Sequence, residues 1–201
     1  MSCIRFVGII LSVLAIILIA FFLFKKNEPF FNLREILSQH ILLFQNCKSQ
    51  YFVFYFFPLL LSIGLSLLVT VNTAFFSHLG VVLSIILSML LALMSILTNY
   101  DYSIIENQKQ KEKLKVVVKQ TTNAIIFSCI IGILMLLIGF VVIAVSDKNI
   151  SWIPIDLNLC KILLSVFTYY GLCVILLTLL LIIKNLTKII AFNLAIERKE
   201  K

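Results

Sequence analysis

The chain has 201 residues, of which 62% are hydrophobic and 13% are charged, about half of the charged fraction that is usual in a soluble domain. Several uncharged apolar runs reach about 20 residues, the length that a helix needs to cross a hydrocarbon core of about 30 Å, so the composition excludes a soluble protein. The net charge of +8 does not indicate nucleic-acid binding, because the lysines flank apolar runs and no aromatic side chain lies between Lys109 and Lys119. The expected fold is all-α: a polytopic integral membrane helix bundle of about five transmembrane helices.

Residues 1–98 are expected to form an N-terminal membrane block with three spans. The segment at about 29–46 has apolar residues at three-four spacing and polar residues opposite, which is typical of an amphipathic helix in the membrane interface; packing beneath the bundle is the alternative. The residues Asn72 to His78 predict a tight turn, and therefore an antiparallel hairpin of the second and third spans. The spans are expected at about 6–24, 51–71 and 79–98.

The third span carries small residues at every fourth position, which places them on one ridge of a helix. We call Gly80, Ser84, Ser88 and Ala92 the small-residue ridge. Small side chains let membrane helices approach closely. The ridge therefore predicts helix packing within the protomer or an interface between copies of the chain.

Residues 99–122 are polar and are expected to form a cytoplasmic lysine-rich helix that runs into the next span. No glycine or proline interrupts the segment. Its lysines are expected to dock anionic phospholipids or an acidic soluble partner protein; a solvated charged face is the alternative. The lysines are Lys109, Lys111, Lys113, Lys115 and Lys119.

Residues 123–201 are expected to form a C-terminal membrane block that ends in a basic tail. Its two spans are expected at about 124–145 and 162–183. Gly132 and Gly139 are seven residues apart, so they share roughly one face of the first of these helices. We expect that face to pack against another helix or another copy.

The distribution of basic residues predicts how the chain is threaded. With the N-terminus outside and the C-terminus in the cytoplasm, fourteen of the 17 Lys and Arg residues lie inside and only Arg5, Lys148 and Lys161 lie outside. The high content of Ile, Phe, Lys and Asn is typical of a bacterial protein. We therefore expect the bacterial cytoplasmic (inner) membrane.

Residues typical of catalysis and of ion coupling are missing from the sequence. The five apolar runs contain no Asp, Glu, His, Lys or Arg, which disfavours an ion-coupled transporter. No metalloprotease, serine-hydrolase or paired-carboxylate pattern occurs, and the five cysteines have no CxxC spacing. We expect no enzyme, no cofactor and no metal site.

The span layout, and the helix from Glu106 to Lys119 that leads into Thr121-Thr122-Asn123, resemble the small multi-pass membrane subunits of bacterial anti-phage defence systems, such as the membrane component of Kiwa. Those proteins are of similar size, oligomerise in the inner membrane and work with a soluble protein encoded beside them. The resemblance implies a sensor that responds to membrane disturbance and signals through its partner.

These observations favour a membrane-embedded, homo-oligomeric sensor or anchor that docks a soluble cytoplasmic partner. Two other functions are open at this point. Uncharged spans with Ser and Thr on one face are compatible with a pore-forming or membrane-permeabilising protein. The third hypothesis is a membrane subunit of a transport complex.

Overall fold

The computed structural model describes residues 38, 48–69, 71–100, 105, 108–146 and 157–197. These residues form four helices and no strand: α3 (Lys48–Leu68), α4 (Thr73–Thr98), α5 (Gln108–Ser146) and α6 (Leu157–Glu197). The expected first span at 6–24 lies outside the described residues, as does the expected interfacial helix at 29–46 apart from Ser38. The described part of the chain is therefore helical throughout, as the sequence predicts.

Three of the four helices are long and apolar enough to cross a membrane. They are α4 over its full length, α5 from Gln108 to Ile143 and α6 from Lys161 to Phe192. The apolar part of α3, Phe52–Leu68, is shorter; it contains Pro58, and α3 continues as one helix through this residue. Membrane insertion is thus supported, with three candidate spans in the described part of the chain.

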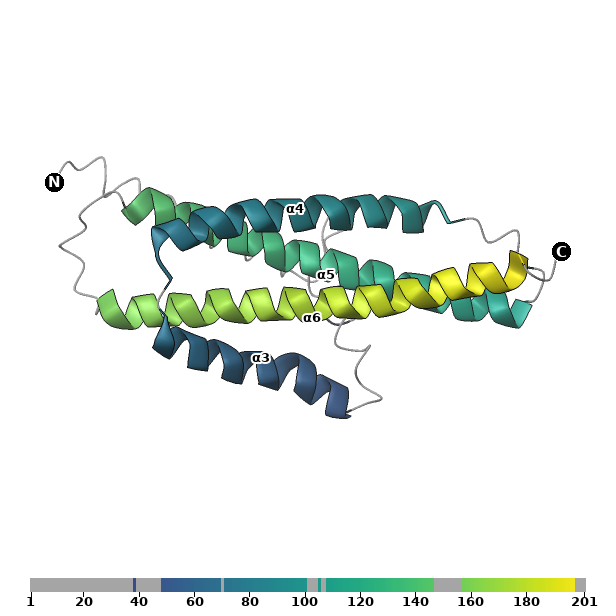
Figure 1. The fold of residues 1–201 in the computed structure, drawn as a ribbon, viewed down its shortest axis with the longest axis horizontal. Helices are drawn as coiled ribbons and strands as arrows, with labels where there is room; N and C mark the ends of the chain where they lie inside the picture. Colours follow the sequence, from purple (N-terminus) through teal and green to yellow (C-terminus); the bar gives the residue numbers. More distant parts are fainter. Residues whose placement is uncertain are drawn as a thin grey trace.

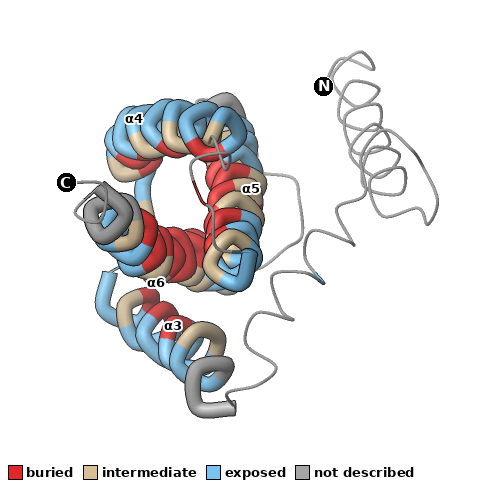
Figure 2. Tube along the Cα trace, turned by 90° about the vertical axis from the view of Figure 1, so that its right-hand side faces the viewer, coloured by how far each residue is buried: buried red, intermediate tan, exposed pale blue. Residues whose placement is uncertain are grey.

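The helices α4, α5 and α6 run lengthwise beside one another, with α5 antiparallel to the other two (Figure 1). Seen along the bundle, their buried faces point to a common interior (Figure 2). The fourth helix, α3, packs on α6, on the side away from α4. The core thus lies among three helices, and α3 covers the outside of one of them.

The helices α3 and α4 run antiparallel and are joined by a short link, as predicted, but they do not pack against each other as a hairpin, because α6 lies between them (Figure 1). The predicted turn at Asn72–His78 is wrong: α4 already begins at Thr73, after Asn72, whose side chain accepts a hydrogen bond of 2.8 Å from the Phe75 N–H. The link between the helices is bonded to α6. The Val71 N–H donates to Ser165 Oγ at 3.0 Å, and the Tyr169 hydroxyl donates to the Val69 carbonyl at 3.2 Å.

Buried residues recur at alternating three- and four-residue intervals on α5 and α6, and mainly at seven-residue intervals on α4. This is the heptad spacing of coiled coils, in which two positions in seven face the neighbouring helices. In α4 the most buried series has a residue every seven positions: Phe76, Leu83, Leu90 and Leu97. In α5 the series is Leu114, Val118, Thr121, Ile125, Ser128, Gly132, Met135 and Gly139, and in α6 it is Thr168, Gly171, Ile175, Thr178, Ile182, Asn185 and Ile189.

Candidate functional site

The helices α5 and α6 are about twice as long as the hydrocarbon core of a membrane is thick. With 39 and 41 residues, they measure about 58 and 61 Å. In α6, Lys161 and Lys184 bracket the uncharged residues 162–183, which cover about 33 Å, close to one hydrocarbon core. The remaining length lies beyond Lys184, at the end of the bundle where α5 begins (Figure 1). We call residues 108–118 of α5 and 189–197 of α6 the stalk.

The register of α5 against α6 follows from one contact. A Cβ added at Gly171 would lie 2.5 Å from the Met135 sulfur, so these two residues face each other. Because antiparallel helices rise equally per residue, a step of seven along each brings Ser128 opposite Thr178, and a second step brings Thr121 opposite Asn185. The same register places Lys119 at a height between those of Lys184 and Lys188.

The five central lysines fall into two groups by height. Lys119 lies at the base of the stalk with Lys184 and Lys188, and we call these three the boundary lysines. All three are exposed. Lys109, Lys111, Lys113 and Lys115 lie further out, about 6 to 15 Å beyond Lys119, and we call them the stalk lysines; Lys111 is half-buried and the other three are exposed.

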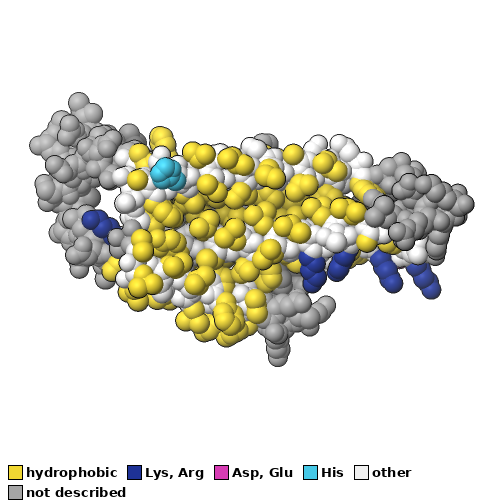
Figure 3. Space-filling view, in the orientation of Figure 1, with side chains coloured by type: hydrophobic (Ala, Val, Ile, Leu, Met, Phe, Trp, Pro, Cys, Tyr) yellow, Lys and Arg dark blue, Asp and Glu magenta, His cyan; other side chains and the backbone are white. Residues whose placement is uncertain are grey.

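The molecular surface is hydrophobic along most of the bundle and carries lysines at one end. A broad hydrophobic area covers most of the visible face, and the lysine side chains gather toward the end where α5 begins and α6 ends (Figure 3). The stalk shares one apolar core with the membrane zone, since Leu114, Val118 and Ile189 are buried in the same cluster as Ile125 and Ile182. The stalk lysines are therefore held on packed helices that continue directly into the membrane zone.

The interior between α5 and α6 is polar at two heights in the membrane zone and at its boundary. Thr121 and Asn185 form one layer, and Ser128 and Thr178 form another; all four are buried. The hydroxyls of Thr121 and Thr178 donate to carbonyls of their own helices, Val117 at 2.8 Å and Val174 at 2.7 Å. The Ser128 hydroxyl is buried without a hydrogen-bond partner. The small side chains in these layers let the two helices approach each other.

The small-residue ridge lies on the outside of the bundle. Gly80 is half-buried, whereas Ser84, Ser88 and Ala92 are exposed. The Ser84 and Ser88 hydroxyls donate to the Gly80 and Ser84 carbonyls at 2.8 and 2.9 Å, so neither serine needs water or a neighbour for this bond. Of the two packing alternatives, the described fold leaves three of the four ridge residues without a role inside the protomer.

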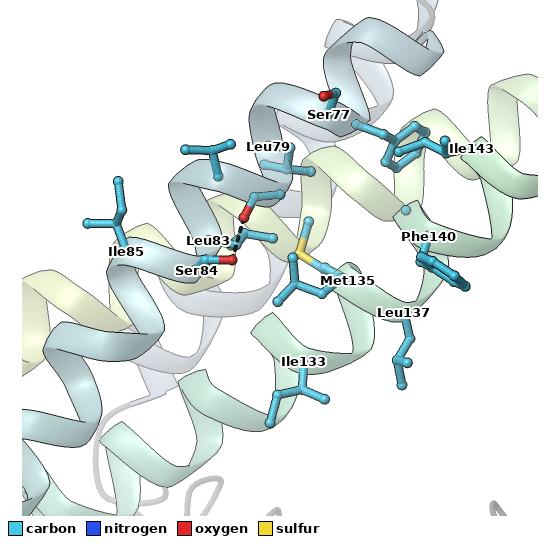
Figure 4. Close-up of a pocket in the computed structure, with 15 residues that line it drawn as sticks. Ser77, Leu79, Leu83, Ser84, Ile85, Ile133, Met135, Leu137, Phe140 and Ile143 are labelled. Atoms are coloured by element: carbon cyan, nitrogen blue, oxygen red, sulfur yellow. Dashed lines mark hydrogen bonds between the residues drawn. The ribbon is translucent and has the colours of Figure 1, made fainter.

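A shallow apolar groove lies beside the ridge, between α4 and α5 (Figure 4). It encloses about 820 Å³ and includes two ridge residues, Gly80 and Ser84. Figure 4 shows Ser84, Ile85 and Leu83 on one wall and Met135, Leu137 and Phe140 on the other. The groove can accept aliphatic groups from the membrane or from another helix, but it contains no side chain suited to catalysis.

The two glycines singled out in α5 are packing positions. A Cβ added at Gly132 would lie 3.0 Å from Leu87 Cδ2, and one added at Gly139 would lie 3.1 Å from Phe76 Cδ1. Both glycines therefore allow α4 to approach α5. The tightest such position, Gly171 against Met135, was not singled out by sequence; the seven-residue spacing from Gly171 through Thr178 to Asn185 is the signal that identifies it.

Within the described ranges, no group of three or more His, Cys, Asp and Glu side chains is arranged to hold a metal ion, and Cys129 and Cys173 are free thiols. Comparisons of the whole chain with protein-family models, with curated proteins and with solved structures find no match.

Proposed function

We propose that the protein is a homo-oligomeric anchor or sensor in the bacterial inner membrane that docks a soluble, acidic cytoplasmic protein through its stalk lysines. The observation that carries the proposal is the continuity of α5 and α6. Each helix runs without a break from the membrane zone to the stalk. A partner bound at the stalk lysines is thereby joined to the membrane by two packed helices.

The heptad packing supports a sensing role as well as an anchoring one. The interior face of α5 is buried from Leu114 in the stalk to Gly139 in the membrane zone, and the facing residues of α6 are buried from Thr168 to Ile189. Packed interfaces of this kind move as units because their side chains interdigitate at native density. A change in membrane thickness or tension that tilts one helix would therefore shift the lysines on the other.

The proposed threading has the N-terminus outside, five spans and the stalk in the cytoplasm. The excess of basic residues at the stalk end supports this orientation. In this threading α3 is the second span, held against α6, and the run at 6–24 is the first. Of the rival functions, a pore gains no support from the described bundle, whose buried threonine hydroxyls bond to their own helices.

The small-residue ridge and the adjacent groove support the proposed oligomer. An exposed ridge of small side chains lets a helix of a second copy approach α4 closely, and the groove offers space for its larger side chains. A role in anti-phage defence is proposed from the resemblance to the membrane subunits of such systems. In that role the docked partner is the effector, and the membrane protein controls it.

The test is recovery of copurifying proteins from cells that carry the natural operon. Replacing Lys109, Lys111, Lys113 and Lys115 together by Glu should abolish recovery of the soluble partner and leave membrane insertion intact. The matched control replaces the same four lysines by Arg, which keeps the charge and should keep the partner. Equal recovery from the Glu variant and the wild type would contradict the docking proposal.

A further inference from the structure

The three boundary lysines share the height at which the uncharged stretches of α5 and α6 end. In α5 the uncharged stretch begins after Lys119, and in α6 the uncharged stretch 162–183 ends at Lys184, with Lys188 one turn further and the apolar residues Ile189 to Phe192 beyond it. The third core helix, α4, ends at Thr98. This height is about 33 Å from the opposite end of the uncharged stretch of α6, so it coincides with one face of the hydrocarbon core.

The surface of α6 on the membrane side of the boundary lysines is apolar, and it is continuous with Lys184 and Lys188. Leu176, Leu180 and Lys184 follow at four-residue intervals, so they lie on one face of the helix, and Lys188 extends the series by one turn. Leu176 and Leu180 are 49% and 62% exposed, which leaves their side chains available to lipid. An acyl chain lying along the two leucines would bring its headgroup to the two ammonium groups.

We propose that Lys184 and Lys188, with Lys119 at the same height on α5, form a binding surface for anionic phospholipids in the leaflet on the stalk side. The ligand chemistry is a phosphodiester with a net negative charge joined to an acyl chain. Lysine side chains suit this position because the methylene stem lies along apolar surface while the ammonium group reaches the headgroup. Each basic residue near an anionic surface contributes attraction that falls off within about 10 Å.

Distance along α5 separates the boundary lysines from the stalk lysines. The headgroup layer on each side of the hydrocarbon core is about 5 to 8 Å thick. Lys109, Lys111 and Lys113 lie about 9 to 15 Å beyond Lys119 along the helix, outside that layer. The boundary lysines therefore bind lipid, and the outer stalk lysines lie beyond the headgroup layer. The lipid proposal does not depend on the proposed docking function.

The test compares two triple variants with the same change in charge. One carries Lys119→Gln, Lys184→Gln and Lys188→Gln, and its control carries Lys109→Gln, Lys111→Gln and Lys113→Gln. Each purified protein is titrated with phosphatidylglycerol in mild detergent, and bound lipid is counted by native mass spectrometry. Phosphatidylcholine and soluble glycerol phosphate are the other two probes.

The expected result is that wild type and control retain phosphatidylglycerol, whereas the boundary variant needs at least tenfold more lipid for the same occupancy. Replacing the three boundary lysines by Arg should restore retention, since the charge and most of the stem return. Equal retention by the two Gln variants would overturn the proposal. So would phosphatidylcholine bound as well as phosphatidylglycerol, or glycerol phosphate that displaces the lipid at equal concentration.

Discussion

Individual glycines set how closely the core helices pack. In lipid the association of helices depends on van der Waals contact, since the surrounding chains are as apolar as the side chains. Gly171 is buried, and an added Cβ would meet the Met135 sulfur at 2.5 Å, closer than two such atoms approach. Gly64 in α3 gives the matched contrast, because a Cβ added there meets nothing within 4 Å.

Replacing Gly171 by Ala should therefore lower the free energy of unfolding by up to about 2 kcal/mol, because the usual cost of overpacking a core, about 1 to 3 kcal/mol, is offset by the roughly 1 kcal/mol that alanine contributes as the better helix former. Gly64→Ala should leave stability unchanged or raise it by up to about 1 kcal/mol, since alanine is the better helix former. Unfolding in detergent is the measurement. Adding Met135→Ala to Gly171→Ala should recover part of the loss; two equally stable single Gly variants would contradict the contact.

At the scale of helices, the sequence predicts most of the elements but not their neighbours. The apolar runs and the glycine-free lysine segment predict α4, α5 and α6 because length and composition decide helix formation in a membrane. The short link after α3 predicts a hairpin, yet that link crosses α6 through bonds to Ser165 and Tyr169. Those partners lie about 100 residues away, so no local pattern reveals them.

The sequence does not predict which face of α5 and α6 points to the interior of the bundle, and the reason is physical. In water, a helix shows its packed face by contrast with a polar one. In the membrane zone both faces are apolar, so the contrast vanishes, and the packed face is marked by smaller residues such as Ser128, Gly132 and Gly171. The seven-residue spacing of Gly132 and Gly139 predicts that they lie on the packed face, because glycine is rare in this segment. The heptad positions between them are occupied by residues that give no such signal.

The register of α5 against α6 makes a direct prediction for crosslinking. In a variant without the native cysteines, Thr121→Cys with Asn185→Cys should form a disulfide on mild oxidation, because the two positions share a height. Thr121→Cys with Thr178→Cys should not, since the positions are one heptad apart, about 10 Å along the axis, and a disulfide requires Cα atoms within about 7 Å. Gel mobility with and without reductant shows which of the two double-cysteine variants forms a disulfide. A disulfide in the Thr121→Cys, Thr178→Cys variant alone would contradict this register of α5 against α6.

The exposed ridge on α4 makes a prediction about assembly. Ser88→Leu with Ala92→Leu adds bulk to the ridge and should reduce the native mass in mild detergent from an oligomer toward a monomer. Val82→Phe with Met89→Phe adds bulk at exposed positions off the ridge and should leave the mass unchanged. A native mass unaffected by the ridge substitutions would show that the chains associate through another face.

At the scale of the whole molecule, we propose a membrane zone and a stalk that share two continuous helices. The apolar length of α6 fits one hydrocarbon core between Lys161 and Lys184, and the remaining residues carry the stalk beyond it. Lipid bound at the boundary lysines would fix the depth of the bundle. The stalk lysines would then lie at a defined height above the membrane, where a soluble partner can reach them.

The most direct test of this account is the sidedness of the two ends of the bundle. Single cysteines are introduced by Lys113→Cys or Lys161→Cys into a variant without the native cysteines, and spheroplasts are treated with a membrane-impermeant maleimide. We predict labelling at position 161 in intact spheroplasts and at position 113 only after the membrane is disrupted. Labelling of both positions from the same side would contradict it, because the two lysines would then not lie at opposite faces of the membrane.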